Sequence, residues 1–171
     1  MSWTIVEPVV DLSVRFLCLK KYPGHPQGCP NYEKKEGCPP CAPAIVDLID
    51  LDLPVWAIWN EFDFKGHCRK MRKLYPHWSK RRIECCLYWQ PKARKQLKKT
   101  IERFHAWYLF RAANEKKSVF EPYVITNPEG AGVNVTETMK SIGIELQWPP
   151  MTKTYQIVLA GTAVKESEVV R

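Results

Sequence analysis

Residues 55–64 read VWAIWNEFDF, and this stretch is expected to form the central strand of the fold. Its run of apolar side chains is typical of a strand that is buried on both faces. The longest uninterrupted apolar stretch in the chain, Val55–Trp59, lies within it. A membrane-spanning helix needs roughly 20 apolar residues, so the sequence predicts no membrane span.

Helical patterns flank this strand. Residues 65–75 are predicted to form a helix that stops before Pro76, because the residue before a proline is disfavoured in helical conformation. A longer helix is predicted from Pro91 to Asn114, since proline suits the first helical position and an apolar stripe follows it. Residues 44–51 are expected to form a short helix.

The rest of the chain adds strands and one capped helix. Asn134 and Glu137 have the spacing of a capping box, and Gly143 is the expected left-handed C-cap of that helix. The remaining strands are expected at residues 3–10, 13–19, 144–148 and 155–161.

Alternation of strands with helices predicts the α/β class, with a mixed sheet flanked by helices. A chain of 171 residues with 45% hydrophobic residues has enough apolar material for one core. We therefore expect a single domain over residues 1–171, with a long metal-clamped loop near the N-terminus.

This loop carries the most specific motif. Residues 20–43 contain six prolines and three glycines, which excludes a helix or an interior strand. A loop of this length inside a domain needs something to hold it. Four thiols lie at its start and within it, in the spacing Cys18-x10-Cys29-x8-Cys38-x2-Cys41.

Four thiolates suit either zinc or an iron–sulfur cluster. Two features favour iron and sulfur: a zinc ribbon normally has two Cys-x-x-Cys pairs and only one is present, and the Cys29-Pro30 and Cys38-Pro39 pairs are similar to the cysteine–proline pairing of ferredoxins. A thioredoxin-like redox pair at Cys38 and Cys41 is a further alternative. The expected cofactor is a 4Fe-4S cluster, with zinc as the alternative.

The motifs RFLC (15–18), GCPNY (28–32) and CPPC (38–41) together resemble a prokaryotic family of uncharacterised predicted metal-binding proteins. Segments 127–129, 141–144 and 155–159 are similar in type and order to that family's C-terminal part. The resemblance implies an iron–sulfur cluster at Cys18, Cys29, Cys38 and Cys41. Family members often carry another cysteine group before the Pro-Glu segment, and residues 118–134 contain none.

A second group of thiols and imidazoles lies in the middle of the chain. It is a candidate for a further metal site or a reactive thiol, although ordinary packing is the favoured explanation. Its members are His67, Cys68, His77, Cys85 and Cys86.

Charge is segregated along the chain, whose formal net charge is +8. Residues 65–117 contain 17 lysines and arginines against three acids, whereas the remainder has nine against fifteen. This basic middle, expected to be helical, predicts an anionic substrate, a nucleic acid or an acidic protein as partner, or simply a solvated helix face. The candidate anion-binding residues are Arg69, Arg72, Lys80, Arg81, Arg82, Lys95, Lys98 and Lys99.

Three functions fit these patterns. The first is a small redox or cluster-dependent enzyme, or a component of one, acting on an anionic substrate or partner. The second is a nonenzymatic module, stapled by zinc or a cluster, that binds RNA or an acidic protein. The third is an electron-transfer subunit. The N-terminal residues show no export signal, so a cytoplasmic location is expected.

Overall fold

The computed structural model describes residues 2–21, 26–114, 121–147 and 149–164. Its centre is a four-stranded sheet of order β1-β2-β4-β3, in which every pairing is antiparallel. The strands are β1 (Trp3–Val6), β2 (Val55–Phe62), β3 (Tyr123–Ile125) and β4 (Thr154–Gly161).

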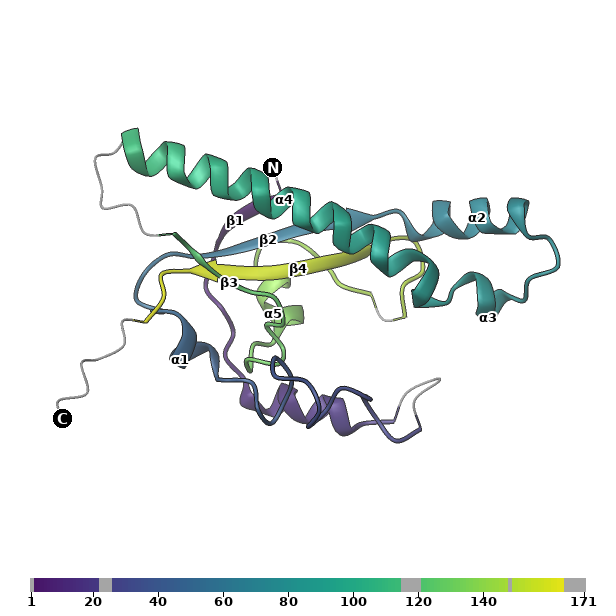
Figure 1. Ribbon diagram of the computed structural model, residues 1–171, viewed down its shortest axis with the longest axis horizontal. Helices are drawn as coiled ribbons and strands as arrows, with labels where there is room; N and C mark the ends of the chain where they lie inside the picture. Colours follow the sequence, from purple (N-terminus) through teal and green to yellow (C-terminus); the bar gives the residue numbers. More distant parts are fainter. Residues whose placement is uncertain (1, 22–25, 115–120, 148, 165–171) are drawn as a thin grey trace.

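Helices cover both faces of this sheet (Figure 1). The long helix α4 (Cys86–Asn114) crosses one face. The opposite face carries α1 (Ile45–Leu48), α5 (Val135–Lys140) and the 3-10 helix η1 (Leu12–Leu19). Helices α2 (Phe64–Leu74) and α3 (Lys80–Ile83) project beyond one end of the sheet.

The strand β2 lies between β1 and β4, so both of its edges are hydrogen-bonded. Its side chains alternate between the two faces, as the two-residue period of a strand requires. Ile58 packs in the cluster beneath α4, together with Val158 of β4. Ala57 and Leu159 pack in the cluster on the opposite face. The central strand is thus apolar on both sides because both sides are covered.

An aromatic cluster attaches α4 to the sheet. The Phe104 side chain of α4 is fully buried. Its ring centroid lies 5.9 Å from that of Trp3 in β1 and 5.8 Å from that of Trp56 in β2. Trp107, one turn further along α4, lies 5.0 Å from Trp56. Rings from three elements therefore form one contiguous layer.

The α/β class is confirmed, and so is β2 as the central strand. The sheet itself is antiparallel throughout, so the expectation of a mixed sheet was wrong in this respect. Strand β4 and helix α2 lie within a residue or two of their predicted bounds. The capped helix is also confirmed: the Asn134 side chain accepts a hydrogen bond from the Glu137 N–H, and Gly143 has a φ of 77°.

Three expectations about local structure were wrong. Residues 13–19 lie in the 3-10 helix η1, because the Asp11 side chain caps the Ser13 N–H and no strand is available for pairing. Residues 144–147 form no strand, and Trp148 lies outside the described residues. Helix α4 begins at Cys86, so Pro91 lies inside it, where its ring removes one backbone hydrogen bond.

Two further elements differ from expectation in length or existence. The short helix α1 spans only Ile45–Leu48 of the predicted range 44–51. Strand β3 was not foreseen, because three residues are too few to show a period. Among the described residues, no helix has the length and apolarity needed to span a membrane.

Replacement of Phe104 by alanine should strongly destabilise the fold, because it removes the ring that joins α4 to β1 and β2. We expect a loss of about 3–5 kcal/mol in the free energy of unfolding, measured by urea denaturation. Phe110→Ala is the matched control in the same helix, since the Phe110 side chain is 71% exposed. Equal losses in the two variants would contradict this account of the core.

Candidate metal centre

The cysteine loop, residues 18–43, lies on the face of the sheet opposite α4 (Figure 1). Its described residues form turns and bends and no helix or strand beyond the end of η1, as predicted, while residues 22–25 lie outside the described residues. The loop is folded by local backbone hydrogen bonds. The Cys38 N–H donates to the Lys35 carbonyl at 2.8 Å, and the Glu33 N–H donates to the Pro39 carbonyl at 2.9 Å.

Helix η1 brings the first two thiols together. Cys18 lies near its end, and the Cys18 carbonyl accepts a hydrogen bond of 2.7 Å from the Cys29 N–H. Gly28 permits this approach, because a Cβ there would lie 2.6 Å from the Cys18 carbonyl oxygen. Gly28 also has a φ of +84°, in the left-handed region that favours glycine. This hydrogen bond therefore joins the two ends of the ten-residue segment between Cys18 and Cys29.

Arg15 connects η1 to the far end of the loop. Its guanidinium donates to the carbonyls of Pro40 and Ala42, at 2.9 and 2.5 Å. These two carbonyls flank Cys41 in the sequence. Because Arg15 and Cys18 are one turn apart in the 3-10 helix, one short helix positions the segments that carry Cys18, Cys29 and Cys41.

Asn127, which follows β3 closely, connects the loop to the C-terminal half of the chain. Its side-chain Nδ2 donates to the Gly37 carbonyl at 2.7 Å and lies 3.9 Å from the Cys38 sulfur. The neighbouring segment also binds η1, since the Asp11 N–H donates to the Gly132 carbonyl at 2.8 Å. Residues 127–132 are therefore a second anchor for the loop.

The electrostatics of Cys18 show that three of the thiols share one environment. Burial raises the pKa of the Cys18 thiol, and Cys29 and Cys38 raise it further by their charges and, for Cys29, by a hydrogen bond. The Glu129 carboxyl contributes in the same direction. Glu129 reaches the surface in part, yet burial of its carboxyl raises its own pKa. These shifts favour the protonated thiol, and a cation bound among these groups would instead favour the thiolate.

The loop thiols lie in one region, but they do not surround a single metal position. All seven cysteines lie in the described part of the chain and none forms a disulfide. Among the described residues, no group of three or more His, Cys, Asp or Glu side chains is arranged to hold a single metal ion. Cys18, Cys29 and Cys38 are partly buried, whereas Cys41 is exposed.

The second group of thiols and imidazoles is dispersed. Cys68 packs against the small core of Phe62, Phe64, Trp89 and Ala93, and burial raises its pKa, which disfavours the thiolate. Cys86 is exposed and takes no part in this core.

The imidazoles of this group also lie apart. His67 lies 6.0 Å from Phe62 between ring centroids, and its Nε2 is buried without a hydrogen-bond partner. His77 is exposed on the turn between α2 and α3, and Cys85 is partly buried.

The candidate anion-binding residues fall into two classes. Arg72 donates to the Trp78 carbonyl, the Arg82 guanidinium lies 4.2 Å from the Trp78 ring, and Lys80 pairs with Glu84 at 3.9 Å. These three cations have partners within the protein. No ion pair or hydrogen bond involves the side chains of the others within the described part of the chain: Arg69, Arg81, Lys95, Lys98 and Lys99.

Sequence reasoning identified the four thiols but missed the groups that hold their loop. Arg15 and Asn127 stand inside motifs that were noticed only for their resemblance to a family. An arginine three residues before a cysteine ligand could have suggested a partner for exposed carbonyls in a proline-rich loop, because such a loop has few N–H donors of its own.

No protein-family model matches this chain, no curated protein matches it, and no solved structure matches its fold. The function is therefore argued from the site alone.

Replacement of Gly28 by alanine should separate Cys29 from Cys18. The added Cβ would collide with the Cys18 carbonyl and would occupy a backbone conformation that costs roughly 1–2 kcal/mol for a residue with a side chain. We expect a lower metal content and a lower urea midpoint. Gly37→Ala is the control in the same loop, because no atom lies within 4 Å of its added Cβ. Equal metal contents in the two variants would contradict the proposed role of Gly28.

The acid sensitivity of the fold should depend on His67. Burial lowers the pKa of its imidazole, and the charges of Lys92 and Lys70 lower it further. A folded pKa below the unfolded value of about 6.5 means that stability is fully present above that pH and falls as the pH decreases through it. His67→Phe should remove this dependence, while His77→Phe, on the exposed turn, should retain it. Urea midpoints between pH 7.5 and 5 would test this, and identical pH profiles for all three proteins would contradict it.

Proposed function

We propose that this protein binds an iron–sulfur cluster through Cys18, Cys29, Cys38 and Cys41 and acts as a small redox component. The observation that carries the proposal is the folding of the loop around these thiols: the Cys29 N–H donates to the Cys18 carbonyl at 2.7 Å, and the Asn127 amide contacts the Gly37 carbonyl and the Cys38 sulfur. Three sequence positions separated by twenty residues meet there without a disulfide.

The donor set fits such a group. Iron–sulfur clusters are held by cysteine thiolates, commonly four of them. Crowded thiolates repel one another, and a bound cationic centre would convert that repulsion into stabilisation. The Asn127 amide, 3.9 Å from the Cys38 sulfur, is placed to donate to that thiolate. Hydrogen bonds to ligand sulfurs are one means by which a protein sets a reduction potential.

The surroundings of the loop suit exchange with a partner. A bound cluster would supply one-electron chemistry, and this chain's residues would hold it close to the surface, since Cys41 is exposed. A shallow hollow of about 380 Å³ opens beside Cys29 and is lined also by Gly28, Tyr32 and Lys34. Lys34 gives this hollow a positive charge, which favours an anionic substrate or an acidic docking surface.

Zinc is the competing occupant, because it also binds four thiolates. The sequence favours iron and sulfur through the single Cys-x-x-Cys pair and the two Cys-Pro pairs. A zinc-bound protein would keep the stapled loop but would have no redox function.

Anaerobic purification followed by iron, sulfide and zinc analysis tests the proposal. We expect a brown protein with about four iron and four sulfide per chain. Serine substitution of each of Cys18, Cys29, Cys38 and Cys41 should remove most of the iron. Cys86→Ser is the matched control, since Cys86 is exposed and lies outside the loop.

Two results would overturn the proposal. One is a colourless protein with one zinc per chain, which would leave a stapled binding module. The other is a cluster that is lost in Cys86→Ser but retained in Cys29→Ser and Cys38→Ser, which would place it elsewhere in the chain.

A further inference from the structure

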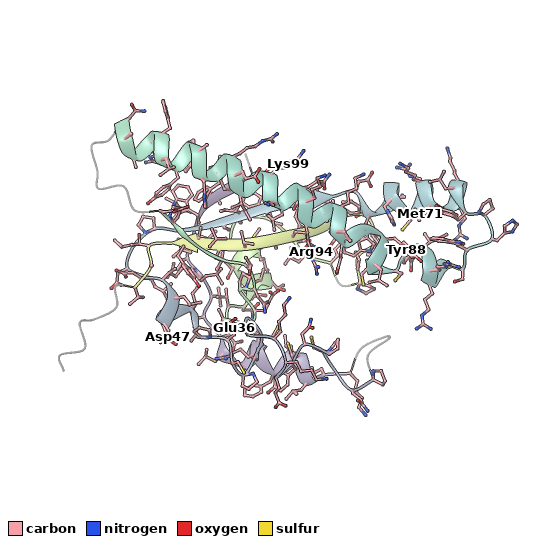
Figure 2. The ribbon with its side chains drawn as sticks, in the orientation of Figure 1. Glu36, Asp47, Met71, Tyr88, Arg94 and Lys99 are labelled. Carbon is pink, nitrogen blue, oxygen red and sulfur yellow. The ribbon has the colours of Figure 1, made fainter. Side chains whose placement is uncertain are left out.

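The basic arm is defined here as residues 64–99, which comprise α2, α3 and the first half of α4. Figure 2 shows Arg94 and Lys99 on α4 and Glu36 of the cysteine loop on the opposite side of the sheet. The arm contains 13 lysines and arginines and one acid, Glu84. Glu84 pairs with Lys80, so within the described residues the remaining cations of the arm have no acidic partner on the arm itself. An uncompensated surface of this kind repels itself unless an anion neutralises it.

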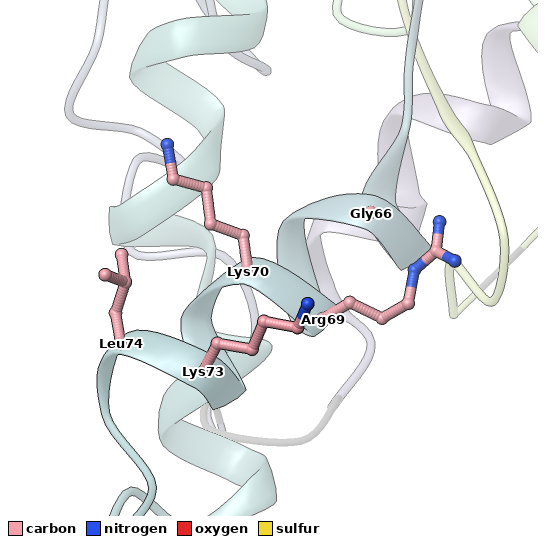
Figure 3. Close-up of a pocket in the computed structure, with 5 residues that line it drawn as sticks. All are labelled: Gly66, Arg69, Lys70, Lys73 and Leu74. Carbon is pink, nitrogen blue, oxygen red and sulfur yellow. The ribbon is translucent and has the colours of Figure 1, made fainter.

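The cations of α2 line a shallow hollow. It has a volume of about 460 Å³ and is lined by Gly66, Arg69, Lys70, Lys73 and Leu74. Figure 3 shows Lys73 extending beside Arg69 along the helix, with Lys70 projecting from the adjoining turn. Gly66 leaves the start of the hollow without a side chain. Three cations around one open concavity are suited to hold phosphate groups.

The positive surface continues from α2 to α4. The charges of Lys70 on α2 and Lys92 on α4 both act on the His67 imidazole, which therefore lies near both. Lys95 and Lys99 follow Lys92 on α4 at intervals of three and four residues, so they lie on neighbouring turns of one helix side. All of these lysines are exposed. The result is a track of cations that runs along two helices, longer than a single phosphate requires.

Aromatic side chains stand at the tip of this track and contact one another. Tyr75 stacks on Trp78 with ring centroids 4.1 Å apart and an interplanar angle of 11°. Arg82 lies over the Trp78 ring, and Tyr88 lies 4.9 Å from it. Trp78 is therefore partly buried, whereas Tyr75 and Tyr88 are each 42% exposed. The stack fixes two tyrosines at the surface with their rings partly open to solvent.

We propose that the basic arm binds single-stranded RNA. The lysines and arginines of α2 and α4 contact successive phosphates, and the exposed rings of Tyr75 and Tyr88 stack with unpaired bases. Leu74 and Leu87, exposed by 57% and 76%, adjoin these tyrosines in the sequence and extend the apolar surface for bases.

The combination of features distinguishes this partner from others. A duplex would use the cations but would leave the aromatic tip without a function, because its bases are already stacked. An acidic protein would likewise satisfy the charges alone. Unpaired bases are the form in which RNA is commonly recognised, by stacking on aromatic side chains and arginine planes. The arm lies across the sheet from the cysteine loop, so the inference does not depend on which metal the loop binds.

Fluorescence anisotropy with the full chain tests the proposal. The probe is a labelled 20-nucleotide single-stranded RNA of mixed sequence, compared with its RNA duplex, the same sequence as single-stranded DNA, and polyglutamate as competitor. We expect single-stranded RNA to bind at least tenfold more tightly than the duplex at the same salt. The slope of log K against log salt should change by roughly 0.7 for each phosphate contact that is lost.

Two sets of variants separate charge from stacking. Arg69→Ala/Lys70→Ala/Lys73→Ala should weaken RNA binding by at least about tenfold and reduce the salt slope by roughly 2. The matched control removes the same charge from exposed lysines on the opposite side of the sheet: Lys20→Ala/Lys21→Ala/Lys35→Ala. Tyr75→Leu should weaken single-stranded RNA by about fivefold or more and leave duplex binding unchanged, whereas Tyr75→Phe should retain full affinity.

Four outcomes would overturn the proposal. Equal affinity for duplex and single strand would show that the aromatic tip is not used. Displacement of the RNA by polyglutamate at equal charge concentration would indicate an acidic protein surface as the partner. Binding of the DNA strand that is as tight as that of the RNA, or tighter, would show that the arm does not select RNA. Equal losses in the two triple variants would show that binding follows net charge and not this surface.

Discussion

The hydrogen bonds from the Arg15 guanidinium to the carbonyls of Pro40 and Ala42 are the constraint on which the proposed centre depends. A loop rich in proline has fewer N–H donors than carbonyl acceptors, so its own backbone hydrogen bonds leave some carbonyls without a partner. Arg15 and Asn127, which lie outside the loop, donate to three of its carbonyls: those of Pro40, Ala42 and Gly37. These anchors determine which thiols meet, because they fix the segments on which Cys38 and Cys41 lie relative to the helix that carries Cys18.

The antiparallel sheet separates two chemically different surfaces. One face supports the cysteine loop through η1 and the segment after β3, and the other carries the long basic helix. The side chains of β2 alternate between the two faces, so Ala57 packs in one core cluster and Ile58 packs in the other. A single four-stranded sheet therefore joins a proposed redox centre to a proposed RNA-binding arm and keeps the four loop thiols on the face away from that arm.

The sequence was sufficient where a local signal decides structure. The apolar run of β2, the stop before Pro76 and the Asn134 cap depend on neighbouring residues, and all three were predicted. The sequence was insufficient where contacts between distant segments determine the structure. Residues 13–19 have the sequence pattern of a strand but form the 3-10 helix η1. The antiparallel pairing of β2 with β4 joins segments about a hundred residues apart. The residues next to Arg15 and Asn127 in the sequence do not indicate which carbonyls these two side chains contact.

The most direct test of the central claim is X-ray absorption spectroscopy at the iron edge on the anaerobically purified protein. We expect iron with sulfur ligands only, together with a second shell of scattering from neighbouring iron atoms, and loss of that second shell in Cys18→Ser. A protein without iron, or iron bound mainly by nitrogen and oxygen, would contradict the assignment of the four loop thiols to an iron–sulfur cluster.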